Sequence, residues 1–84
     1  MAGGEATDER DLTRVRGIGD EYRDLLNAAG VESVIDLRRR NATNLTAALA
    51  DANANAIRST RRSIVRRVPS QTQVERWIAH ASVL

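Results

Sequence analysis

Apolar residues recur at steps of three and four positions along most of the 84-residue chain. Two such stripes are the clearest: Tyr22, Leu25, Leu26 and Ala29, and Val74, Trp77, Ile78 and Ala81. This spacing places side chains on one face of an α-helix, whereas a half-buried strand would require strict alternation. No segment shows a credible strand pattern. The sequence therefore predicts an all-α fold, a compact bundle of about five short helices.

Glycines divide the first half of this pattern. We expect Asp8 to cap a first helix that carries Leu12 and Val15 on its inner face. Arg16-Gly17-Ile18-Gly19 then interrupts the helix, and two glycines around one apolar residue predict a tight hairpin with Ile18 turned inward. A second helix is predicted from near Asp20 to Gly30, where a left-handed glycine would end it in a Schellman motif.

Capping residues mark the later helices. Ser33 with Asp36, and Ser70 with Gln73, have the spacing of a capping box. Asn41 or Thr43 opens a helix between them. A further helix is predicted over residues 54–66, ended by Val68-Pro69 because the residue before proline disfavours helical geometry. The last helix should bury Trp77 in the core.

Composition excludes several classes of protein. Of the residues, 42 % are hydrophobic and 29 % charged, a globular balance. There is no Cys and a single histidine, His80, expected to be exposed, so neither a catalytic constellation nor a metal site can be assembled. No apolar run approaches the ~20 residues that span a bilayer. We expect a cytoplasmic, non-enzymatic chain without cofactor or metal: a flexible tail over residues 1–6 and a single domain over residues 7–84.

The charges are unevenly distributed. Residues 1–36 hold nine acidic residues and four arginines, whereas residues 37–84 hold nine arginines and two acidic residues. All basic residues are Arg. The basic half offers a face for nucleic acid or for an acidic partner; alternatively, the two halves neutralise each other across the fold.

Five arginines are spaced so that a helix would align them as a stripe: Arg58, Arg61, Arg62, Arg66 and Arg67. Such a stripe is either a phosphate-binding surface or simply a solvated helix face.

The segment Leu12-x-x-Val15-x-Gly17-Ile18-Gly19-x-x-Tyr22-x-x-Leu25-Leu26-x-x-Ala29-Gly30-Val31 resembles the helix-hairpin-helix motif. In that family the backbone N–H groups of the hairpin and of the following helix start bind a DNA phosphate. The resemblance implies this role for Gly17, Ile18 and Gly19.

Two later segments extend the resemblance: Gly30-Val31-x-Ser33-Val34-x-Asp36-Leu37 and Arg66-Arg67-Val68-Pro69-Ser70…Val74-x-x-Trp77-Ile78. Together the three segments resemble an uncharacterised bacterial and archaeal family of small helix-hairpin-helix domains. This implies a SAM-like bundle with a Gly-Ile-Gly corner, and it carries no established activity.

Asp20 and Glu21 depart from the motif, because a basic or small neutral residue often follows its second glycine. Their carboxylates would occupy or repel an anion at the helix start; alternatively, Asp20 is the N-cap and Glu21 a first-turn acid favoured by the helix dipole. Tyr22 also stands where the motif usually has a small residue.

The sequence therefore favours a binding module with weak, sequence-independent affinity for nucleic-acid backbone. The predicted contacts are Gly17, Ile18 and Gly19 in the hairpin and the five arginines of the stripe. The alternative is an adaptor that binds another protein, or a second copy, through its acidic and basic halves. Neither a membrane nor a small-molecule substrate is expected as a partner.

Overall fold

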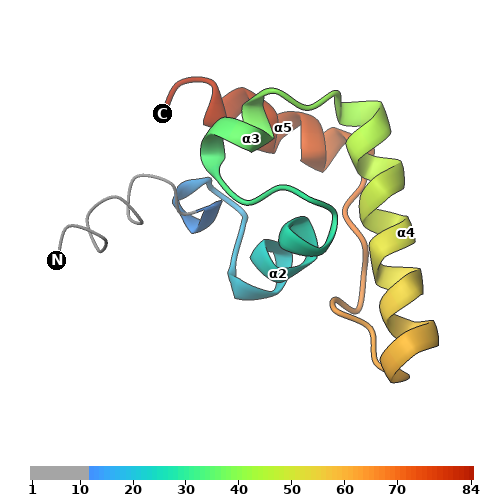
Figure 1. The fold of residues 1–84 in the computed structure, drawn as a ribbon. Coiled ribbons are helices and arrows are strands. Elements are labelled where there is room, and N and C mark those ends of the chain that lie inside the picture. The colour runs from blue at the N-terminus through green and yellow to red at the C-terminus, as the bar shows by residue number, and fades with distance from the viewer. Residues whose placement is uncertain (1–11) are drawn as a thin grey trace, which may run out of the picture.

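The computed structural model describes residues 12–84 and is all-helical over that range, with no strand (Figure 1). A single turn of 3₁₀-helix, η1 (Leu12–Arg14), is followed by four α-helices. These are α2 (Asp20–Ala28), α3 (Val34–Arg38), α4 (Ala42–Thr60) and α5 (Gln71–Ala81). The all-α class is confirmed, but the described residues contain four α-helices rather than about five. The proposed cap Asp8 and the predicted tail over residues 1–6 lie outside the described residues.

Helix α2 ends as the sequence predicts. Gly30 has a φ of 92°, in the left-handed region that glycine adopts without a Cβ clash. The Val31 N–H donates to the Leu26 carbonyl at 2.9 Å, and the Gly30 N–H donates to the Asn27 carbonyl at 3.0 Å. These two bonds define a Schellman motif. They turn the chain sharply and bring Val31 into the core, where it is fully buried.

Helices α3, α4 and α5 each begin at a side-chain cap. Ser33 accepts from the Asp36 N–H, Asn41 from the Asn44 N–H, and Ser70 from the Gln73 N–H. At α3 the returning bond differs from a standard capping box, because the Asp36 carboxylate accepts from the Glu32 N–H rather than from Ser33. The three predicted helix starts are confirmed.

The prediction of a separate helix over residues 54–66 is wrong. Helix α4 runs without a break through the asparagines to Thr60 and ends at Arg61, whose φ of 64° is left-handed. Residues 61–70 then return beside α4 as an irregular segment (Figure 1).

Asn53 holds this return segment in place. It is 8 % exposed, and its Oδ1 accepts the N–H groups of Ile64 and Val65 at 2.7 and 3.1 Å. Its Nδ2 donates to the Val65 carbonyl at 3.2 Å. One amide side chain therefore satisfies three backbone groups of a segment that has no regular structure of its own.

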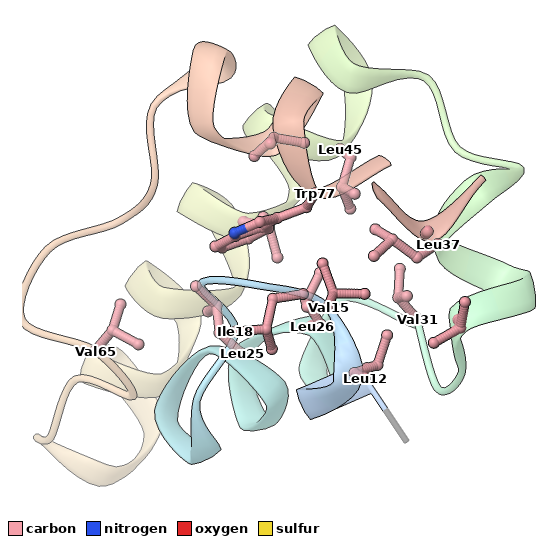
Figure 2. Packing of buried hydrophobic residues seen from close by; sticks show 14 residues of the cluster. Leu12, Val15, Ile18, Leu25, Leu26, Val31, Leu37, Leu45, Val65 and Trp77 are labelled. Carbon is pink, nitrogen blue, oxygen red and sulfur yellow. The ribbon is translucent and has the colours of Figure 1, made fainter. Parts of the chain in front are cut away.

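The core lies between α5, α4 and α2. Helix α5 packs against α3 and α4, and α2 packs against α4. The buried cluster has these members: Leu12, Val15, Ile18, Leu25, Leu26, Val31, Val34, Leu37, Leu45, Leu49, Val65, Val74, Trp77 and Ala81. Figure 2 shows Trp77 in the midst of this cluster. Trp77 is 2 % exposed, and its ring lies 5.1 Å from that of Tyr22.

Replacing Trp77 by alanine should remove the largest side chain of the core and leave a cavity. We expect a loss of about 3–5 kcal/mol in the free energy of unfolding, measured by chemical denaturation. Val83→Ala is the control, since Val83 is 78 % exposed and its truncation should leave stability nearly unchanged. Similar midpoints for the two variants would contradict the burial of Trp77.

Asn53→Leu tests the three hydrogen bonds by which Asn53 holds the return segment. Leucine keeps the side-chain volume but leaves two N–H groups and one carbonyl without a partner, so we expect a loss of at least about 2 kcal/mol. The matched control is Asn55→Leu, the same change at an exposed position two residues along α4. Equal denaturation midpoints for the two variants would exclude a structural role for Asn53.

Candidate nucleic-acid interface

The turn over residues 17–19 presents its backbone outward and its one large side chain inward. Gly17 is exposed and has a φ of 93°, and a Cβ added to it would lie 3.1 Å from Nε1 of Trp77. Ile18 is 4 % exposed within the core, and its N–H donates to the Val15 carbonyl. The side chain of Ile18 therefore anchors the turn and makes no part of its surface.

Gly19 is the N-cap of α2, with extended backbone angles of −94° and −169°, and no side chain caps the helix. The first helical bond runs from the Arg23 N–H to the Gly19 carbonyl at 2.9 Å. The N–H groups of the first turn have no acceptor inside an α-helix. They therefore point outward from α2 with the positive end of the helix dipole behind them.

The interpretation of Asp20 as N-cap is wrong. Asp20 is the first helical residue, its side chain is 82 % exposed, and its carboxylate lies 3.4 Å from the Arg23 guanidinium. This ion pair turns the Asp20 carboxylate toward Arg23, three residues further along α2. It also partly neutralises one of the two acids expected to repel an anion from this helix start.

A cleft of about 440 Å³ opens beside the turn, between it and α5. Its lining residues are Arg16, Gly17, Gln73, Arg76, Trp77 and His80. His80 is half-buried, not exposed as expected, and its Nδ1 accepts the Arg16 N–H at 2.9 Å. This bond fixes the turn to the last helix.

The Arg16–His80 bond joins residues 64 positions apart, and local sequence spacing carries no signal for such a contact. Arg16, Gln73 and Arg76 were likewise missed as site residues. Their positions indicate a shared site only when the turn and α5 are known to lie next to each other.

The five arginines do not form one helical stripe, contrary to the prediction. Arg58 lies in the last turn of α4, Arg61 is the C-cap, and Arg62 follows it. Arg66 and Arg67 belong to the irregular return segment. The left-handed residue Arg61 ends the helix before the stripe is half complete.

Arg67, the last of the five arginines, does lie near the turn. The Tyr22 hydroxyl donates to the Arg67 carbonyl at 3.2 Å, and Tyr22 is in the first turn of α2. The exposed Arg67 side chain therefore originates close to the start of α2. Arg58 instead donates to Oδ1 of Asn55 on its own helix.

Ion pairs do not neutralise the two halves of the chain within the described residues. The two pairs found there join Arg23 to Asp20 and to Asp24, all within α2. The remaining described arginines, in the turn, the return segment and α5 among other elements, form no ion pair with a described carboxylate. The acidic residues Glu5, Asp8, Glu9 and Asp11 lie outside the described residues.

Between residues 12 and 84, no three His, Cys, Asp or Glu side chains gather as a metal site would require. Over the same range, no helix is long and apolar enough to cross a membrane.

A protein-family model described as Domain of unknown function (DUF4332) matches residues 7–84. The chain belongs to this family. Membership in a family without an assigned activity is thus confirmed. Neither a curated protein nor a solved structure matches the DUF4332 chain.

The two glycines of the DUF4332 turn should respond differently to substitution. Gly17→Ala places a Cβ in the left-handed region and against the Trp77 ring, so we expect a loss of about 1–3 kcal/mol in unfolding free energy. Gly19 has no positive φ, and nothing lies within 4 Å of an added Cβ. The turn therefore requires glycine at position 17 but not at position 19, although a glycine on each side of Ile18 would suggest the same need at both.

Gly19→Ala is accordingly expected to unfold within about 0.5 kcal/mol of the parent chain. Thermal and chemical denaturation of both variants provide the measurement. A Gly17→Ala variant as stable as Gly19→Ala would contradict the observed turn geometry.

Proposed function

We propose that this DUF4332 domain is a non-enzymatic helix-hairpin-helix module that binds nucleic-acid backbone independently of base sequence. The observation that supports it most directly is the uncapped start of α2 behind the exposed Gly17–Gly19 turn. Natural helices usually satisfy these N–H groups with a side chain, as α3, α4 and α5 do here. Helix α2 leaves them available to an external acceptor.

A phosphate group suits this position for physical reasons. Its oxygens accept several N–H groups at once, and the helix dipole favours its negative charge. Gly17 and Gly19 have no side chains to keep a bulky backbone at a distance. A phosphodiester presents the same group at every nucleotide, so such contacts position the duplex without reading bases.

Arginines around the turn add to the attraction. Arg16 and Arg76 line the adjacent cleft, and Arg67 lies beside Tyr22. None of the three is neutralised by an ion pair within the described residues. In this proposal Arg66 extends the same surface, while Arg58, Arg61 and Arg62 contribute longer-range attraction from the end of α4.

Gly19→Asp tests the proposal without disturbing the core. A carboxylate at this N-cap position would accept the first-turn N–H groups of α2 and occupy the place proposed for phosphate. We expect stability to be retained and duplex affinity to fall about tenfold or more. Fluorescence anisotropy with two labelled duplexes of unrelated sequence, at low and moderate salt, provides the measurement.

Gly19→Ala is the matched control, since it adds a methyl group without a charge or a cap and should lower duplex affinity much less than Gly19→Asp does. Asp20→Asn with Glu21→Gln should tighten binding by removing repulsion. Absence of duplex binding at low salt, or unchanged binding by Gly19→Asp, would contradict the proposal.

An adaptor that binds a protein, or a second copy of this chain, is the second candidate. It is favoured by the charges of both signs that remain unpaired within the described residues, including Glu32, Asp51 and the arginines of the return segment. The same charge-neutralising variants distinguish the candidates. In an adaptor, removing Asp20 and Glu21 would weaken association, and no duplex would bind.

A further inference from the structure

The cleft beside the turn is lined by positively charged side chains and hydrogen-bond donors. Among the described residues its lining includes two arginines, a glutamine and a histidine, and no carboxylate. Both Arg16 and Arg76 are exposed and have no ion-pair partner within the described residues. A concave surface that gathers guanidinium groups without acids attracts an anion, and guanidinium forks match the oxygens of phosphate.

The hydrogen bond at His80 determines what this ring offers to the cleft. Its Nδ1 accepts the Arg16 N–H at 2.9 Å, so the neutral ring carries its proton on Nε2. His80 therefore contributes a second type of donor, and Gln73 contributes an amide. All four polar side chains that line the cleft can therefore donate hydrogen bonds to one bound acceptor.

Trp77 limits what else the ligand can be. Although it lines the cleft, it is 2 % exposed and its ring is packed against Tyr22. No open aromatic face remains for a base to stack on, which is how proteins usually hold an unpaired base. Recognition in this cleft is therefore directed at the anionic group and the sugar that carries it.

The charge and size of the cleft favour the phosphate at the end of a nucleic-acid strand over a phosphate inside the strand. A phosphomonoester carries about two negative charges at neutral pH, whereas a backbone diester carries one, and two unpaired guanidinium groups match the former. The volume of about 440 Å³ lies in the lower part of the range of small-ligand sites. It accommodates a terminal phosphate with its sugar.

We infer that this cleft binds the terminal phosphomonoester of a nucleic-acid strand, an assignment that rests on the proposed function. Gly17 belongs to both the cleft and the turn, so a strand whose end occupies the cleft passes directly beside the start of α2. Internal phosphates would then contact the turn, and the end phosphate would contact Arg16, Arg76 and His80.

The test compares one short duplex prepared with 5′-phosphate or with 5′-hydroxyl ends. We expect the parent chain to bind the phosphorylated form about tenfold more tightly, the effect of one charge-assisted contact. Arg76→Gln should abolish that ratio, because it removes one guanidinium from the cleft and leaves the buried core untouched. Arg38→Gln is the matched control, the same change at an exposed position in the last turn of α3, and should keep the ratio.

The outcomes separate this inference from the proposed function. Equal binding of both duplexes would overturn the strand-end site and leave backbone binding intact. Failure of both to bind would overturn the two together. Inorganic phosphate should compete with the phosphorylated duplex alone; Arg76-dependent binding of free phosphate without any end preference would assign the cleft to a small phosphate ligand and overturn the strand-end site.

Discussion

The contact between Trp77 and the Gly17 turn is the constraint on which the rest of this small fold depends. A Cβ at position 17 would lie 3.1 Å from the indole nitrogen, so the turn and α5 meet so closely that any larger residue would press against the Trp77 ring. The same ring packs against Tyr22 of α2, whose hydroxyl binds the return segment. The Trp77 side chain therefore sets the position of α5 against the turn and α2, which lie in the first third of the chain, and the cleft between the turn and α5 follows from that arrangement.

Local signals in the sequence were sufficient for most helix boundaries. The Schellman end of α2 and the Ser33, Asn41 and Ser70 caps depend on bonds within six residues, which residue type and spacing predict well. The same reasoning failed where a distant partner decides the outcome. Asparagine disfavours a helix interior, which is consistent with a helix boundary near residue 54, yet the amide of Asn53 is stable inside α4 because residues 64 and 65 supply its hydrogen bonds.

The candidate site shows the same limit. The sequence predicted the glycine turn and Ile18 correctly as structure, but it assigned the arginines to a helix that ends at Arg61. No single motif joins Arg16 to Gln73, Arg76 and His80, since they come from two segments separated by more than half the chain. Their shared role becomes visible only when the core brings the segments together.

The Arg16–His80 hydrogen bond also has a consequence for the order in which the chain acquires its structure. The partners are 64 residues apart, so the turn cannot be fixed until α5 has been synthesised and has left the ribosome. Helix α2 and its Schellman turn can form earlier from local contacts, and α4 can elongate independently. The surface proposed to bind phosphate is thus assembled last. A nascent chain truncated before α5 would carry the glycine turn without the His80 hydrogen bond and the Trp77 packing that fix it.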